Sequence, residues 1–136
     1  MKYINKKLTI EKVSVENIAK KFGTPSYCYS YKQLKENINN FKKNFRSFSP
    51  LICFAVKSNN NINLIREIKK LRLGADVVSI GELMMAIKSG ISPQKIVFSG
   101  VGKTSNEISY AIEKKILLIN AESKSEIEEI NRIARL

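Results

Sequence analysis

The sequence contains no histidine and no tryptophan, and it has only two cysteines among its 136 residues. Without histidine, the chain by itself cannot form a Ser-His or Cys-His catalytic dyad, and a zinc site would lack a common ligand. Cys28 and Cys53 are too few for a disulfide framework and indicate reduced thiols of a cytoplasmic protein. We therefore expect no metal site in this chain.

Long hydrophobic runs are also absent from the sequence. No apolar stretch approaches the roughly 20 residues that a membrane span requires. The segment from Met1 to Lys7 contains lysines but no apolar core of a secretory signal. These absences predict a cytoplasmic protein without a membrane partner.

Acidic residues are half as numerous as basic ones, with 12 against 24, so the net charge is +12. Such an excess raises the hypothesis of a basic nucleic-acid-binding domain. The positive charge is spread from Lys2 to Lys103, however, and arginine, the usual reader of bases, is scarce. The distribution of charge argues against nucleic acid as the partner.

The first third of the chain predicts two helices and one short strand. Apolar spacing favours a helix within residues 7–22, which Gly23-Thr24-Pro25 ends. The aromatic segment 26–30 is typical of a strand, and residues 31–48 have the spacing of a second helix.

From residue 51 onward, a unit of apolar strand and amphipathic helix recurs four times. The expected strands are 51–57, 75–79, 95–99 and 116–120, and the expected helices are 62–73, 81–89, 104–115 and 123–136. Gly74 is expected to close the first of these helices, and Thr104 with Glu107 predicts a capping box. The apolar runs predict an α/β fold with a parallel sheet, either a small open sheet or half of a (β/α)8 barrel, which needs roughly 250 residues.

Lys57 stands directly after six apolar residues, at the carboxyl end of the first expected strand. Active sites of α/β proteins lie at this end of the sheet, and desolvation can make a lysine there a neutral nucleophile. The alternative is a lysine that merely ends a strand and reaches water.

Two acids and one glycine-rich turn are further candidates for chemistry. Asp76 lies within the second apolar strand, within reach of Lys57, or else it is an acid bonded to the backbone. Glu82 either contributes to the site or only favours the dipole of its helix. Gly100-Val101-Gly102-Lys103 is a weak candidate for an anion cradle because the full phosphate-loop pattern is missing.

Four segments carry a resemblance to a known family, and they stand in order as residues 22–25, 51–59, 74–83 and 96–104. Together they resemble the amino-terminal part of the diaminopimelate decarboxylases. That family is in the alanine-racemase-type group of pyridoxal-phosphate enzymes, with ornithine and arginine decarboxylases.

The resemblance implies a role for particular residues. Lys57 would be the catalytic residue that forms the Schiff base with pyridoxal 5'-phosphate, Asp76 a cofactor-binding carboxylate and Glu82 a nearby pocket acid. The implied reaction converts meso-diaminopimelate to L-lysine and carbon dioxide, in a homodimer. A non-catalytic pyridoxal-phosphate-binding module, and a decarboxylase acting on ornithine or arginine, remain alternatives.

The chain departs from the family in what it lacks. The family has an eight-stranded barrel and a carboxyl-terminal β domain, whereas this chain has four units and no histidine to stack on the cofactor. We expect residues 1–31 to pack with the missing β domain and residues 32–136 to form a partial (β/α) barrel. Such a fragment is expected to be inactive by itself.

Overall fold

The computed structural model describes residues 1–136 as two compact units, residues 1–49 and residues 50–136. Each unit has a sheet of its own, with three strands in the first and four in the second. No helix has the length and apolar character needed to span a membrane.

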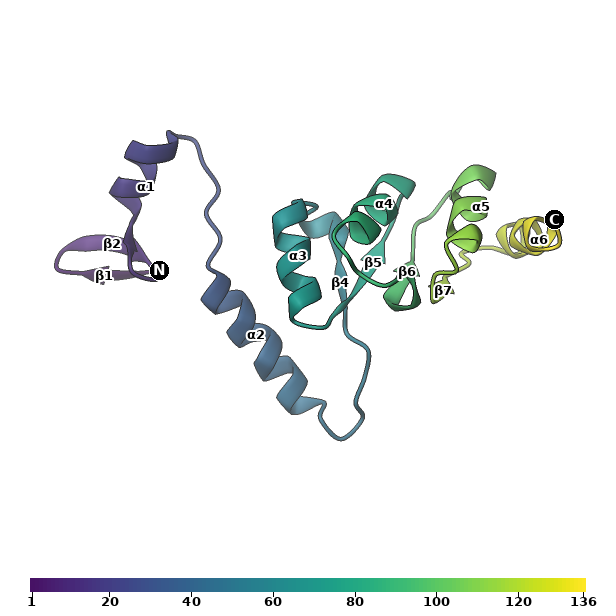
Figure 1. Cartoon of the computed structure of the whole chain (residues 1–136), viewed down its shortest axis with the longest axis horizontal. Helices are drawn as coiled ribbons and strands as arrows, with labels where there is room; N and C mark the ends of the chain where they lie inside the picture. Colours follow the sequence, from purple (N-terminus) through teal and green to yellow (C-terminus); the bar gives the residue numbers. More distant parts are fainter. The chain divides into compact units, whose positions relative to one another are not determined.

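The first unit contains a small antiparallel sheet followed by two helices (Figure 1). Its elements are β1 (Lys2–Ile4), β2 (Lys7–Ile10), β3 (Val13–Ser14), α1 (Val15–Phe22) and α2 (Tyr31–Asn44). The carboxylate of Glu11 accepts hydrogen bonds from the Ser30 hydroxyl (2.8 Å) and the Lys32 N–H (2.9 Å). These bonds tie the β2–β3 turn to the start of α2.

The sequence-based expectation for this unit was partly wrong. The helix expected within residues 7–22 begins only at Val15, and residues 26–30 form no strand. Asn5 and Lys6 have φ of 49° and 64°, which makes the two-residue turn of a hairpin. An Asn-Lys pair is a weak hairpin signal beside Asn-Gly, so the strands were missed.

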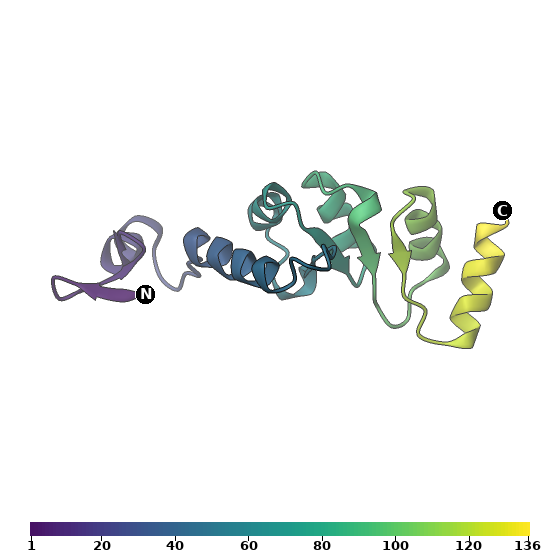
Figure 2. The ribbon, with the colours of Figure 1, turned by 90° about the horizontal axis from the view of Figure 1, so that it is seen from below.

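The second unit repeats strand and helix four times, as the sequence predicted. Its elements are β4 (Cys53–Ala55), the 3-10 turn η1 (Val56–Ser58), α3 (Ile62–Lys70), β5 (Gly74–Val77), α4 (Ile80–Lys88), the 3-10 turn η2 (Pro93–Lys95), β6 (Ile96–Phe98), α5 (Ser105–Glu113), β7 (Leu118–Ile119) and α6 (Lys124–Ala134). The strands pair in parallel in the order β4-β5-β6-β7. Helices α3, α4 and α5 follow one another along one side of the strands, and α6 lies beyond β7 (Figure 2).

The core of this unit lies on one face of the parallel sheet. Ala75, Val77, Ile96 and Phe98 are fully buried there. The strand register pairs Ala55 with Asp76 and Asp76 with Val97, so these three share the opposite face, where each is only half-buried. One face is therefore packed and the other is open, as expected for part of a barrel.

Gly74 does not close α3, contrary to the expectation. The helix ends at Lys70, and Arg72, with φ of 62°, supplies the left-handed residue. Gly74 is instead the first residue of β5, where a Cβ would collide with the Lys95 carbonyl oxygen and lie 2.9 Å from Cys53 Sγ. This glycine is required by the close approach of neighbouring strands.

Candidate functional site

Lys57 lies in the turn η1, two residues after β4 ends at Ala55. The turn is fixed on both sides of it. Val56 is fully buried, and the Ser58 hydroxyl donates to the Ala55 carbonyl at 2.7 Å. The Lys57 side chain itself is exposed and makes no ion pair, so its amine is open to a ligand.

The exposure of Lys57 corrects one expectation. The sequence predicted a strand reaching Lys57 and a desolvated amine, whereas the strand is shorter and the side chain is in water. The four-stranded sheet is packed on one face only, and the side chain of Lys57 lies outside the packed core.

Asp76 lies on β5, the strand next to β4, which ends two residues before Lys57. Its Oδ1 atom is buried and has no hydrogen-bond partner, so this oxygen is not bonded to the backbone. Burial, together with the charge of Asp76, raises the pKa of the neighbouring Cys53 thiol. No ion pair joins Asp76 to Lys57, although β4 and β5 are adjacent.

Glu82 caps its own helix. Its Oε2 accepts the Val78 N–H at 2.9 Å, while the Glu82 N–H donates to the Ser79 hydroxyl at 3.3 Å. The carboxylate is therefore engaged at the start of α4, which favours the interpretation of Glu82 as a helix-capping acid.

Glu107 caps two helices at once. The capping box with Thr104 is present as predicted, with the Thr104 N–H donating to Oε2 at 3.0 Å. The other oxygen, Oε1, accepts the Ile80 N–H at the start of α4, also at 3.0 Å. The hydrogen bonds from Thr104 and Ile80 lower the pKa of Glu107 below its usual value. The sequence predicted the hydrogen bonds between Glu107 and Thr104 but not the hydrogen bond from Ile80 of the neighbouring helix α4.

Lys103 does not serve an anion cradle. Its side chain is 1% exposed, and its ammonium group pairs with Glu126 of α6 at 2.7 Å. Burial raises the pKa of Glu126. The hydrogen bonds from the Glu122 N–H and from Lys103 lower it by more than burial raises it, so the pKa lies below its usual value. Sequence reasoning missed Lys103 as a structural residue because two of its three acceptors, on Asn120 and Glu126, come from later parts of the chain.

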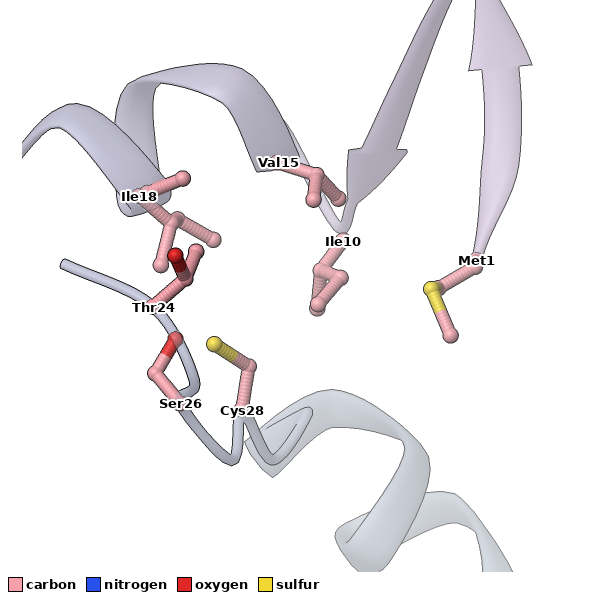
Figure 3. Close-up of a pocket in the computed structure, with 8 residues that line it drawn as sticks. Met1, Ile10, Val15, Ile18, Thr24, Ser26 and Cys28 are labelled. Atoms are coloured by element: carbon pink, nitrogen blue, oxygen red, sulfur yellow. The ribbon is translucent and has the colours of Figure 1, made fainter.

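A pocket of about 280 Å³ lies in the first unit, between β2, α1 and the segment after α1 (Figure 3). Ile10, Val15 and Ile18 line it on one side, and Thr24 and Cys28 on the other. None of its side chains carries a charge, and the thiol of Cys28 is the only titratable side chain among them.

Comparison with known proteins shows the family to which this chain belongs. Residues 31–135 match the model of the family described as pyridoxal-dependent decarboxylase, pyridoxal binding domain. A diaminopimelate decarboxylase from Aquifex aeolicus is 44% identical over 134 residues, covering 98% of this chain and 31% of that protein.

Solved structures agree with this match. A diaminopimelate decarboxylase from M. jannaschii in complex with L-lysine has a TM-score of 0.92 at 38% identity, over 95% of this chain and 31% of that one. The Helicobacter pylori enzyme in complex with L-lysine has a TM-score of 0.85 at 42% identity, over 88% and 30%. The chain thus spans under a third of the length of these relatives, and it belongs to the pyridoxal-dependent decarboxylase family, whose pyridoxal binding domain it matches.

Proposed function

We propose that this chain is the cofactor-binding part of a diaminopimelate decarboxylase, which converts meso-diaminopimelate to L-lysine and carbon dioxide. The names of the similar proteins support this substrate, and two of the similar structures hold L-lysine. The observation that carries the proposal is Lys57, an exposed and unpaired lysine at the carboxyl end of a parallel strand.

The residues at this edge fit pyridoxal phosphate. The Lys57 amine is available to hold the cofactor through Nζ, and the unpartnered Oδ1 of Asp76 can accept a hydrogen bond or face a positive group. Ala55, paired with Asp76 on the open face and two residues before Lys57, has a side chain small enough to leave room for a planar ring. When bound, pyridoxal phosphate supplies an electron sink for the bond that breaks at the substrate α-carbon.

The residues around Lys57 and Asp76 hold these two side chains in place rather than act as acids or bases. The buried Val56 and the Ser58 hydrogen bond hold the backbone on either side of Lys57, which fixes where its side chain leaves the backbone. The pairing of Ala55 with Asp76 sets the carboxylate at a fixed register beside it. With no histidine in the chain, we propose that the chain binds the cofactor but does not turn over substrate by itself.

Borohydride trapping tests the role of Lys57. The chain is incubated with pyridoxal phosphate, reduced, digested and analysed by mass spectrometry, which should place the pyridoxyl adduct predominantly on Lys57. Lys57→Ala should lose this adduct, whereas Lys88→Ala, which removes an exposed lysine of α4, should keep it. Equal labelling of all exposed lysines, or lysine formation from meso-diaminopimelate by the chain alone, would contradict the proposal.

We also propose that residues 1–31 are covered by a carboxyl-terminal domain in the complete protein, a cytoplasmic homodimer. The large apolar side chains of this segment support the proposal, since Phe22, Tyr27 and Tyr29 are 70%, 91% and 65% exposed. A full-length protein that protects these side chains from oxidative labelling, and sediments as a dimer, is the expected result. Full labelling of them in that protein would refute it.

A further inference from the structure

The ammonium group of Lys103 is buried and fully bonded. It donates to the Gly100 carbonyl at 2.6 Å, to the Asn120 carbonyl at 2.7 Å and to Glu126 Oε1 at 2.7 Å. A lysine ammonium has three N–H donors, so all of them are used. In addition, the ring centroid of Phe98 lies 5.7 Å from Nζ, within the range of a cation–π contact.

The three acceptors come from three different elements. Gly100 follows β6, Asn120 follows β7, and Glu126 stands in the first turn of α6. Asn120 adds two bonds of its own, from its N–H to the Phe98 carbonyl and from Nδ2 to the Ser99 hydroxyl, both at 2.9 Å. One side chain therefore joins the carboxyl ends of two neighbouring strands to the following helix.

The loop held by Lys103 is in turn packed against β5. The Ser99 N–H donates to the Val77 carbonyl at 2.9 Å. A Cβ on Gly100 would lie 2.6 Å from the Val78 carbonyl oxygen, so the two backbones are in close contact. Val77 directly follows Asp76, and a shift of the loop would therefore act on the strand that carries the candidate carboxylate.

We propose that Lys103 is a positioning residue, which holds residues 99–102 against the end of β5 and so sets the Asp76 side of the cofactor site. The proposal rests on the proposed function. Because its ammonium is saturated, Lys103 is not available to bind the cofactor itself, and it acts through the backbone. Removing one partner of a buried ion pair leaves the other charged and unsatisfied, so the arrangement is expected to be sensitive to substitution.

The chain supplies a matched control in Lys114. This lysine also pairs with a glutamate at 2.7 Å, Glu113, and also lies over an aromatic ring, that of Tyr110. Its side chain is 36% exposed, against 1% for Lys103. Lys103→Met and Lys114→Met therefore remove the same charge from similar partners, and only the first removes it from a buried junction.

Two measurements on the whole chain test the proposal. Hydrogen exchange at the Ser99 and Asn120 amides should become about tenfold faster or more in Lys103→Met, because the substitution removes all three hydrogen bonds of the buried ammonium group. The concentration of pyridoxal phosphate that half-labels Lys57 should rise by about the same factor. Lys114→Met should change neither quantity.

A general loss of stability must be separated from loss of position. Ile108→Ala removes a fully buried side chain of α5 and lowers stability without removing any of the hydrogen bonds of Lys103. At a temperature where both variants are folded, Lys103→Met should weaken labelling of Lys57 more than Ile108→Ala does. Equal weakening would show that Lys103 has only a structural role and would overturn the proposal.

A milder variant keeps the test valid if Lys103→Met does not fold. Glu126→Gln retains an acceptor oxygen but removes the charge opposite Lys103, and it should accelerate exchange at Ser99 and Asn120 by a smaller factor. Unchanged exchange in the foldable variant would overturn the proposal. If the unaltered chain shows no labelling at Lys57, the proposed function fails. The inference that Lys103 sets the Asp76 side of the cofactor site then fails as well. Faster exchange at the Ser99 and Asn120 amides in the variants would still support the part of the inference that Lys103 holds residues 99–102 in place.

Discussion

Residues 1–49 and residues 50–136 differ in how they are held together. The second unit contains fourteen buried apolar residues, whereas the first contains none and buries only Thr9. The first unit also carries a net charge of +8, from 11 basic and 3 acidic residues, against +4 in the second, from 13 and 9. Like charges repel one another, and few buried apolar contacts oppose that repulsion in the first unit.

This difference shows that residues 50–136 form a hydrophobic core of their own and that residues 1–49 do not. The second unit buries one face of a parallel sheet under helices, which is enough for a core although the other face stays open. The first unit depends on hairpin hydrogen bonds and on polar contacts such as those of Glu11. We expect its stability to come largely from whatever covers its apolar side chains.

The largest expected effect comes from a pair of phenylalanines, one in each unit. Phe98 is fully buried in β6, and Phe98→Ala should cost about 3–5 kcal/mol of unfolding free energy because it leaves a cavity in the core. Phe48 is 78% exposed, and Phe48→Ala should stay within about 0.5 kcal/mol. Urea unfolding followed by circular dichroism measures both. Similar losses for the two variants would mean that the first unit has a core after all.

A smaller effect is expected at the helix caps. Thr104 caps α5 with its side chain, so Thr104→Ala should cost about 1 kcal/mol. Ser14 precedes α1 but makes no capping bond, and its buried hydroxyl has no partner, so Ser14→Ala should be neutral or slightly stabilising. Thermal unfolding of the two variants decides this comparison. A clear loss in Ser14→Ala would show that its hydroxyl is bonded in solution.

The smallest effect concerns acid titration. Hydrogen bonds from Arg132 and from the Ser105 hydroxyl lower the pKa of Glu129 from 4.5 to about 2, whereas the pKa of Glu16 is lowered chiefly by Lys20 within one helix. Because the folded-state pKa of Glu129 is depressed, its contribution to stability is present above pH 4.5 and is lost as the pH falls toward 2.

Carboxyl-detected NMR titration measures the midpoints. Glu129 should titrate below Glu16, Arg132→Met should move the Glu129 midpoint up toward 4.5, and Lys124→Met, on the same helix, should leave it unchanged. A Glu129 midpoint near 4.5 in the unaltered chain would refute the hydrogen bonds of Glu129 with Arg132 in α6 and with Ser105 in α5.

Local signals explain which elements were predictable. Thr104 and Ser123 each precede a glutamate by three residues, and each begins a helix where the sequence predicted one. Ser79, which the sequence placed at the end of a strand, caps α4 with the same spacing to Glu82. The repeat of strand and helix predicted the parallel sheet because such crossovers lead back to a neighbouring strand. The hairpin of residues 2–14 was missed because its turns contain neither Asn-Gly nor Asp-Gly, and positive φ at Asn5 and Lys6 is not evident from residue type.

The sequence by itself determined the four strand–helix units, the capping box of Thr104 and Glu107, and the place of Lys57 just beyond the first strand. These depend on residues a few positions apart, whose preferences act within one turn or one strand. Only the tertiary structure decided that Lys57 is exposed, that Asp76 has an unpartnered oxygen, and that Lys103 is buried. Each of these depends on groups that are distant in sequence and meet only when the strands pair, because burial and hydrogen bonding are properties of the packed chain.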